Sequence, residues 1–377
     1  MTHESLVARC SACRYTLVRI AILVSLALGI FSISPRCHGA DIHVPRDHST
    51  ISAAMAAAES GDVILVAPGL YTAASGETFP IAMKAGVILA GTGGDAGVTE
   101  INADGSGANV ITCWNIASDM RTQIENLTIR GGDFPPGVDI RGGGIELDDA
   151  SPVIIDCVID GNRATHGGGI ECRNGSSPLV IGSVVSNNEC LYNGGGVHSY
   201  NFSNPVFLAC DFTGNVSGLC GGGYFGAVDS SQILVNCRLY GNAAVGGGGG
   251  LHSGNRTHTT LFNCLITGNT ARAQNYGGGG GLRFLDTDAV TIIHCTIADN
   301  AADRGTEISC ECSSAPILFR GCIVWNGTDP GSPSLIHDTH GVLDFIYCDV
   351  KGGVSGTGNI DTDPLFIDQP DYADAPD

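Results

Sequence analysis

Four side chains with complementary chemistry recur at two fixed offsets from glycine runs in neighbouring segments of the sequence. Glu171 and Arg173 follow the run at 167–169, and His198 and Tyr200 follow the next run at the same two offsets. A carboxylate, an anion-binding guanidinium, a titratable imidazole and a phenol together suit β-elimination on a uronic acid. This quartet is the candidate catalytic site, and an ordinary solvated polar face is the alternative interpretation.

Further side chains at or near these offsets are candidates for ligand binding. The first offset holds Phe225, His252 and Arg283 in the following segments, and Phe225 could stack on a sugar ring. Tyr276 lies in an insertion that makes one segment four residues longer than 27. Insertions in repeat proteins often mark the binding side, although a neutral change of length explains this one equally well.

The cysteines occupy a different position and have two interpretations. Buried free thiols are favoured for the main set, because neighbours in a parallel stack point their Cβ atoms the same way and oppose disulfide geometry. Cys190 and Cys220 lie off this set in adjacent turns and are the candidate disulfide. No metal site and no cofactor are predicted. Asp361 and Asp363 could hold calcium, but a polar tail loop is the favoured interpretation of this segment.

These candidates are positioned by an internal repeat of about 27 residues. Starting from Cys157, equivalent positions follow at spacings of 26, 27, 27, 27, 31, 27 and 26 residues, and an asparagine recurs in step with them. Within each repeat, apolar and polar residues alternate and a Gly-Asn turn follows, which is typical of short, half-buried strands. The equivalent positions of the cysteine set are Cys157, Ser183, Cys210, Cys237, Cys264, Cys295, Cys322 and Cys348.

Short strands and tight turns at this period predict an all-β solenoid, a single-stranded parallel β-helix whose coils stack about 4.8 Å apart. Residues 126–353 form its regular coils, and residues 41–125 form an N-terminal cap with irregular first coils. Within that cap, Ser49 could begin a helix that ends at Gly61 and covers the open end of the core. Residues 354–377 read as an acidic C-terminal tail.

The first forty residues resemble an export signal. Three arginines precede the apolar segment 20–33, which is too short for a comfortable bilayer span of about 20 residues. Residues 1–40 are therefore predicted to be a cleaved signal peptide, with an uncleaved membrane anchor as the alternative. We expect an extracytoplasmic protein that is secreted, periplasmic or on the outer surface, with no membrane span after cleavage.

Composition and net charge limit the kinds of partner that the chain can bind. The chain has 377 residues, 55 of them glycine, and a formal net charge of −20. Without residues 1–40, which hold four Arg and one Glu, the charge becomes −23. Such an acidic chain repels phosphate backbones and anionic membranes, so nucleic acid is excluded as a partner. The sequence does not indicate an oligomeric state.

Several motifs carry a resemblance to known proteins. The segment Gly61-Asp62-Val63-Ile64-Leu65-Val66-Ala67-Pro68-Gly69 resembles the N-terminal region of pectin-lyase-like right-handed β-helix proteins. Gly-Gly-[Ile/Val/Leu] elements paired with Phe212-Thr213-Gly214-Asn215 resemble the repeats of chlamydial polymorphic outer membrane proteins. The resemblance implies a right-handed coil over roughly residues 41–368, and it implies little about activity because this fold hosts many functions.

Two functions remain open on the sequence. The preferred hypothesis is an exported, non-catalytic surface or extracellular protein whose rigid face serves adhesion or binds a polysaccharide or cell-surface glycan. The alternative is a polysaccharide lyase that acts by β-elimination on a glycan containing uronic acid. Whether the chain is an enzyme is therefore left undecided by the sequence.

Overall fold

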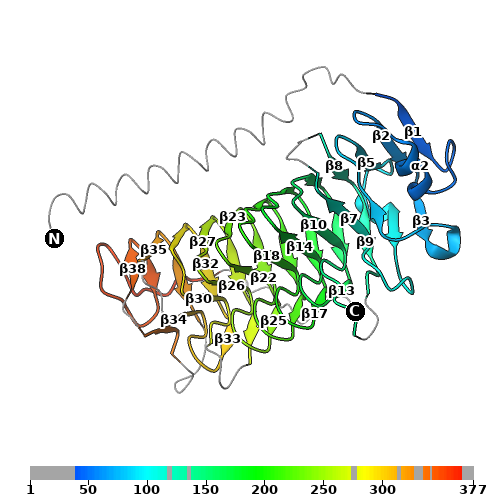
Figure 1. Ribbon diagram of the computed structural model, residues 1–377. Coiled ribbons are helices and arrows are strands. Elements are labelled where there is room, and N and C mark those ends of the chain that lie inside the picture. Colours follow the sequence, from blue (N-terminus) through cyan, green and yellow to red (C-terminus); the bar gives the residue numbers. More distant parts are fainter. Residues whose placement is uncertain are drawn as a thin grey trace. The chain divides into compact units, whose positions relative to one another are not determined.

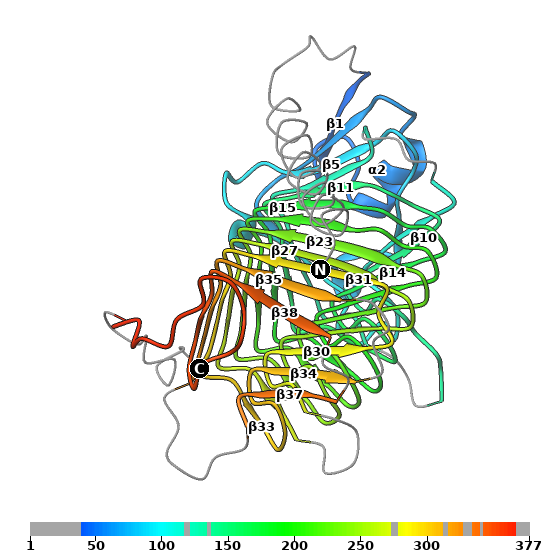
Figure 2. The ribbon, with the colours of Figure 1, turned by 90° about the vertical axis from the view of Figure 1, so that its left-hand side faces the viewer.

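The computed structural model describes residues 39–116, 121–133, 137–272, 278–311, 316–326, 334–339 and 342–366. Within these ranges the chain winds through four sheets, and strands from successive coils lie side by side in parallel (Figures 1 and 2). The predicted all-β parallel β-helix is confirmed. Six of the described coils have four strands, because a two-residue strand of the smallest sheet is added to the other three.

Sheets A and C carry the long faces of the coil. In the described ranges, sheet A consists of β1 (Asp41–Val44), β2 (Val63–Val66), β5 (Ile88–Gly91), β8 (Gln123–Glu125), β11 (Val153–Ile155), β15 (Leu179–Ile181), β19 (Val206–Leu208), β23 (Ser231–Val235), β27 (His258–Phe262), β31 (Ala289–Ile293), β35 (Ile317–Arg320) and β38 (Leu343–Ile346). Sheet C consists of β4 (Ile81–Ala82), β7 (Ile111–Trp114), β10 (Ile145–Asp148), β14 (Ile170–Arg173), β18 (Val197–Tyr200), β22 (Tyr224–Ala227), β26 (Leu251–Gly254), β30 (Leu282–Leu285), β34 (Ile308–Glu311) and β37 (Ile336–Asp338).

Sheets B and D complete each coil before the chain returns to sheet C. Sheet B consists, among the residues described, of β3 (Gly69–Thr72), β6 (Thr99–Asn102), β9 (Thr128–Arg130), β12 (Val158–Asp160), β16 (Val184–Ser186), β20 (Asp211–Thr213), β24 (Arg238–Tyr240), β28 (Leu265–Thr267), β32 (Thr296–Ala298), β36 (Ile323–Trp325) and β39 (Asp349–Val350). Sheet D consists of β13 (Arg163–Ala164), β17 (Glu189–Cys190), β21 (Val216–Ser217), β25 (Ala243–Ala244), β29 (Thr270–Ala271) and β33 (Ala301–Ala302).

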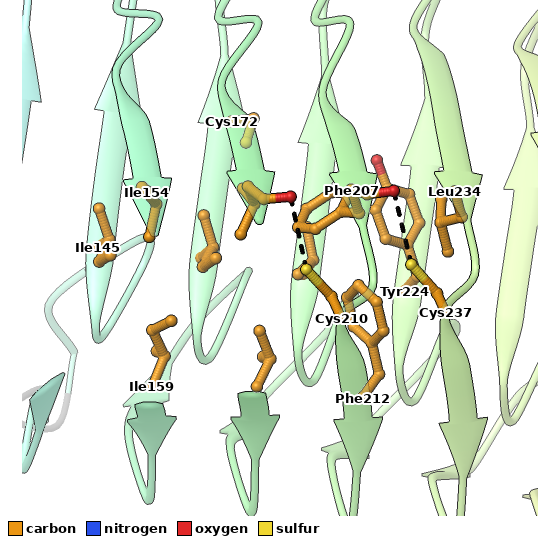
Figure 3. Close-up of a cluster of buried hydrophobic side chains, with 14 of the residues drawn as sticks. Ile145, Ile154, Ile159, Cys172, Phe207, Cys210, Phe212, Tyr224, Leu234 and Cys237 are labelled. Atoms are coloured by element: carbon orange, nitrogen blue, oxygen red, sulfur yellow. Dashed lines mark hydrogen bonds between the residues drawn. The ribbon is translucent and has the colours of Figure 1, made fainter. Parts of the chain in front are cut away.

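The cysteine column lies inside the coils, as predicted. All seven of its cysteines are free and between 0% and 3% exposed. Figure 3 shows Cys210 and Cys237 side by side on adjacent coils, each with its thiol directed to a carbonyl oxygen of the preceding coil. At the column position where serine replaces cysteine, the Ser183 hydroxyl accepts a hydrogen bond from the Cys157 amide. The thiols therefore act as small buried side chains that pack the core.

A buried asparagine ladder runs parallel to the cysteine column. The backbone and side-chain amides of Asn188 both donate to Oδ1 of Asn215, and Asn215 donates in the same way to Asn242. Each ladder side chain also donates to a carbonyl of the preceding coil, as Asn215 does to Val185. Among the residues described, none of the ladder asparagines has a buried side-chain polar atom without a partner, so the ladder fixes the turn with little desolvation penalty. The ladder consists of Asn162, Asn188, Asn215, Asn242, Asn269 and Asn300.

A short helix packs over the first coils, as predicted. Helix α2 (Ile51–Ala57) buries Ile51, Ala54 and Met55 against β1, β2 and β4. Its N-cap is Thr50, whose hydroxyl accepts from the Ala53 amide, and the sequence prediction of Ser49 is wrong by one residue. The only other helical turns in the ranges described are η1 (Ala73–Ser75) and η2 (Ala96–Val98).

The two chain ends are only partly described. Residues 1–38 of the predicted signal peptide and residues 367–377 of the predicted tail lie outside the described residues. In the described part of the chain, none of the helices has the length and apolar character needed to cross a bilayer. Export and signal cleavage stay predictions.

Candidate functional site

The first offset from each glycine run forms one continuous row across sheet C. The strand register pairs Glu171 with His198 and His198 with Phe225, and the row continues through His252 and Arg283. The prediction that equivalent offsets stack on adjacent coils is confirmed. We call this set the covered row: Glu146, Glu171, His198, Phe225, His252 and Arg283.

The covered row is buried although it points away from the interior of the coil. Glu171 is 0% exposed and His198 is 2% exposed. The glycine run turns back over the row, so that a Cβ on Gly167 would lie 2.8 Å from Oε2 of Glu171 and one on Gly194 would lie 2.8 Å from Cβ of His198. The glycine two positions before the last glycine of each run also has positive φ. The interpretation of this row as a solvated face is therefore wrong.

Two of the four predicted catalytic residues form a buried pair. Nδ1 of His198 lies 2.7 Å from Oε2 of Glu171, and Nη1 of Arg141 lies 4.0 Å from the other carboxylate oxygen. The ring of His166 stacks on that of His198 with centroids 5.1 Å apart. Burial lowers the pKa of His166, and the neighbouring His198 makes the second-largest contribution. The resulting pKa is about 4, so His166 is neutral at physiological pH.

Arg173 joins a different group from the one predicted. Its Nη2 atom lies 2.9 Å from Glu146 and 2.8 Å from Asp148, both on the preceding strand β10. Burial raises the pKa of the Glu146 carboxyl, and Arg173 and a hydrogen bond from the Trp114 side chain oppose this rise. The quartet therefore divides into a Glu171–His198 pair and an Arg173–carboxylate cluster.

A second row lies two positions further along the strands and reaches solvent. The strand register aligns Trp114 with Asp148, and Asp148 with Arg173. Tyr200 is the next member, because the residues before Arg173 and Tyr200, Cys172 and Ser199, are paired. Trp114 is 54% exposed and Tyr200 is 38% exposed. This row continues on one side into exposed amides. We call the set the exposed row: Trp114, Asp148, Arg173 and Tyr200.

Those amides form a short ladder beside the exposed row. Nδ2 of Asn174 donates to Oδ1 of Asp148 at 2.6 Å, and Nδ2 of Asn201 donates to Oδ1 of Asn174 at 2.7 Å. Both asparagines have positive φ, at 55° and 56°, a conformation that asparagine tolerates well. Exposed aromatic rings and hydrogen-bonding amides therefore lie together on one face.

Sequence reasoning missed Trp114 as a member of this site. It ends β7, where Cys113 is buried and Trp114 is exposed, so the alternation of side chains along a strand could have placed it outside the coil. Arg141 and His166 were missed as well. The signal for them is their position directly before a glycine run, where the structure pairs them in one bridge.

The predicted ligand-binding residues of the covered row do not face solvent. Phe225 is stacked on His252 with centroids 4.8 Å apart, and Nη2 of Arg283 lies 3.3 Å from Glu311. Burial is the main cause that lowers the pKa of His252 to about 3, and the positive charge of Arg283 is the second. Because Phe225 is buried by the glycine turn, stacking on a sugar from solvent is not available to it. Tyr276 lies outside the described residues.

The predicted disulfide is not formed. Cys190 and Cys220 are both free, because register pairs Cys190 with Ser217 and bridges Cys220 with Asn193. Burial raises the pKa of the Cys190 thiol to about 12. The thiol of Cys220 instead accepts from Nη1 of Arg283 at 3.8 Å. The two cysteines are therefore at positions of their coils that do not align with each other.

The carboxylates proposed for calcium serve the terminal loop. Oδ1 of Asp361 accepts from the Gly352 amide at 3.1 Å, and Oδ1 of Asp363 accepts from the Leu365 amide at 3.0 Å. Over the ranges that the structure covers, no three His, Cys, Asp or Glu side chains are grouped as metal ligands. Calcium binding stays an untested prediction.

Comparisons with families support the right-handed coil. Residues 45–209 match a family described as "Protein of unknown function (DUF1565)", and residues 185–342 match the "Right handed beta helix region" family. No curated protein matches the chain. The parallel coils seen in the structure and the second match together establish a right-handed β-helix. The likeness to polymorphic outer membrane protein repeats stays a prediction.

Three solved structures are similar to the chain at low identity. Geobacillus virus E2 ORF18 has a TM-score of 0.53 and 14% identity, and the match covers 83% of this chain and 62% of that one. Pectate lyase Pel9A has a TM-score of 0.47 and 14% identity, covering 86% and 79%. The catalytic domain of a GH87 alpha-1,3-glucanase, solved with tetrasaccharides, has 0.30 and 12%, covering 87% and 71%. At these identities the likeness concerns the fold alone.

Proposed function

We propose that this chain is an exported, non-catalytic β-helix protein that binds a glycan through the exposed row. The proposal is carried by one observation: solvent-exposed Trp114 and Tyr200 flank a charged pair on consecutive strands of sheet C, beside an exposed ladder of amides. Aromatic rings offer an apolar face with a polar edge, and amides pair with hydroxyl groups. A sugar presents the same two kinds of surface.

The spacing of the exposed row suits an extended ligand. Trp114 and Tyr200 are separated by three strand-to-strand steps, which at the usual strand spacing is about 14 Å. A linear oligosaccharide lying across the strands would contact both rings at once. The strands are fixed by their parallel neighbours, so the face needs little ordering when it binds.

The state of the ionisable groups favours binding over catalysis. Arg173, predicted to bind a substrate carboxylate, already contacts two carboxylates of the protein. Glu171 and His198 are buried beneath the glycine turn, where a bound polymer cannot reach them without rearrangement of the backbone. A general base must lie within hydrogen-bond reach of the proton that it removes.

A polysaccharide lyase is the second candidate, and the Glu171–His198 pair favours it. A carboxylate bonded to Nδ1 of an imidazole fixes the tautomer and leaves Nε2 as the basic atom. If the glycine turn opened, His198 would be placed beside Tyr200, whose ring centroid is 5.8 Å away. This arrangement would suit removal of a proton from a uronic acid.

Affinity electrophoresis in gels containing single polysaccharides tests the proposal. Wild type should be retarded by at least one glycan, and Trp114→Ala should weaken that binding about tenfold because a stacked ring is lost. Trp114→Phe keeps a ring and should lose less. Tyr347→Ala is the matched control, since Tyr347 is 60% exposed on a distant coil.

Two results would contradict glycan binding by the exposed row. One is equal retardation of wild type and Trp114→Ala, and the other is no retardation by any polysaccharide. The lyase alternative is assayed on uronate polymers by the ultraviolet absorbance of unsaturated products. Absorbance that grows with wild type and is abolished in His198→Ala would replace our proposal with that alternative.

A further inference from the structure

We infer that the exposed row selects uncharged glycans and rejects uronates, a specificity that rests on the proposed binding function. The one cation of the row, Arg173, is committed to the protein. Its Nη2 atom contacts Glu146 at 2.9 Å and Asp148 at 2.8 Å, and its side chain is 27% exposed. A carboxylate from solvent would have to compete with two that are already in place.

Asp148 is held at the surface of the exposed row by contacts to both of its carboxylate oxygens. One of its carboxylate oxygens accepts from Arg173 and the other accepts from Asn174. These two contacts hold the carboxylate in position beside the two exposed rings. The cluster of Arg173, Asp148 and Glu146 thus holds one positive charge against two acidic groups.

The groups behind this cluster add no free positive charge. Arg141 faces two carboxylates, with Nη2 lying 3.3 Å from Asp139 and Nη1 lying 4.0 Å from Glu171. His166 is neutral because burial lowers its pKa to about 4. A polyanion approaching the exposed row therefore meets a local excess of acid on a chain whose formal net charge is −20.

Uncharged sugars avoid this repulsion and use what the face offers. The rings of Trp114 and Tyr200 stack without regard to charge, and the amides of Asn174 and Asn201 can bond to hydroxyl groups. The residue types of this face suit β-elimination on a uronic acid. Its ion pairs, however, leave it better suited to binding neutral glycans. Specificity of this kind comes from repulsion of the wrong ligand.

Matched polymers that differ only in charge test this inference. Fully methyl-esterified homogalacturonan is compared with the same polymer after de-esterification, and hydroxyethylcellulose with carboxymethylcellulose. Wild type should bind the neutral member of a pair at least about tenfold more tightly. Added salt should leave neutral binding unchanged and narrow the gap, because it screens the repulsion.

A charge variant makes the test specific to the exposed row. Asp148→Asn keeps the size of the side chain and frees Arg173 from one carboxylate, so the ratio of uronate to neutral affinity should rise about tenfold. Asp211→Asn is the control, because it removes the same charge from the Asp211–Arg238 pair on sheet B. That control should leave the ratio near its wild-type value.

Each outcome has one meaning. Stronger binding of the neutral polymers, with a ratio that moves only in Asp148→Asn, supports the inference. Equal or tighter binding of the uronate polymers would overturn the selectivity while glycan binding itself stands. Failure to bind either member of both pairs, together with Trp114→Ala behaving as wild type across a wider polysaccharide panel, would overturn both.

Discussion

The asparagine ladder inside the coils and the covered row on sheet C are both buried stacks, yet they follow opposite rules. The ladder repeats one residue type through six coils, and its members bond to one another. The covered row changes residue in almost every coil. Within the described ranges, unpaired buried atoms occur on Glu171, His252 and Arg283, and on none of the ladder asparagines.

This difference between the two stacks indicates that the ladder maintains the fold, whereas the covered row can change its residues from coil to coil. A stack with one side chain per coil can satisfy every polar atom only if each member both donates and accepts, which asparagine does. The covered row has a wall of glycine backbone beside it and no such repeat, so each residue is set by its immediate neighbours. Disruption should therefore be costly in the ladder and mild in the covered row.

The largest effect is expected from breaking the ladder. Asn215→Ala removes the acceptor of two Asn188 amides and the donor to Val185 and Asn242. Because several buried groups are left unpaired, we expect a loss of about 4 kcal/mol in the free energy of unfolding, measured by denaturant titration. Asn201→Ala, in the exposed amide ladder, should cost only about 1 kcal/mol, mainly because alanine is strained at the positive φ of this position. Similar losses in the two variants would contradict the contrast.

The next effect concerns the residue at which the ladder ends. Glu307 takes the place of the last glycine of its run, and its carboxylate accepts from the backbone amide of Asn300 at 3.0 Å and from Nδ2 of Asn326 at 2.7 Å. Burial raises the pKa of Glu307 to about 8, although these hydrogen bonds lower it in part. A repeated glycine is here replaced by a buried acid.

The raised pKa of Glu307 predicts that stability falls as the pH rises. Between the unfolded pKa near 4.5 and the folded pKa of about 8, the folded state binds more protons than the unfolded state. The contribution of this group is therefore full below about pH 4.5 and declines by about 1.4 kcal/mol per pH unit above it. We expect Glu307→Gln to remove this decline, measured as unfolding free energy at about pH 5 and about pH 7. Parallel profiles for wild type and variant would refute it.

The repeated features of the molecule could be predicted from the sequence because they occur once per coil. The cysteine column and the asparagine row follow directly from the 27-residue spacing, and both are buried in the structure. The helix over the first coils is also predicted, with its cap misplaced by one residue. Period and alternation are properties of the chain, so the sequence alone contains them.

The candidate site could not be predicted in the same way, because it depends on contacts between coils and turns. Alternation places Glu171 outside the coil, but only the path of the glycine turn shows that it is buried. Arg173 contacts Glu146 and Asp148 because its side chain extends toward the preceding strand. This direction cannot be read from the spacing of the repeats. Trp114 precedes Asp148 by 34 residues, so the 27-residue alignment does not bring them together.

The smallest effect is expected in the covered row itself. His252 is 3% exposed, its Nδ1 atom has no hydrogen-bond partner among the residues described, and it lies beside the cation of Arg283. Its pKa is lowered to about 3 in the folded state, against about 6.5 when unfolded, so the unfolded state binds more protons as the pH falls below about 6.5. His252→Leu should change stability by less than about 1 kcal/mol near pH 8, where the histidine is neutral in both states.

At about pH 5 the same variant should be more stable than wild type by about 2 kcal/mol, because it removes the proton that only the unfolded chain can accept. Paired unfolding curves at the two pH values measure this directly, and the difference between them cancels any change in packing that is independent of pH. His258→Leu is the control, since it replaces an exposed histidine in β27 and leaves the buried covered row intact. If His252→Leu is as costly as Asn215→Ala at both pH values, the covered row is as essential to the coil as the ladder, and the two stacks do not differ as we argue.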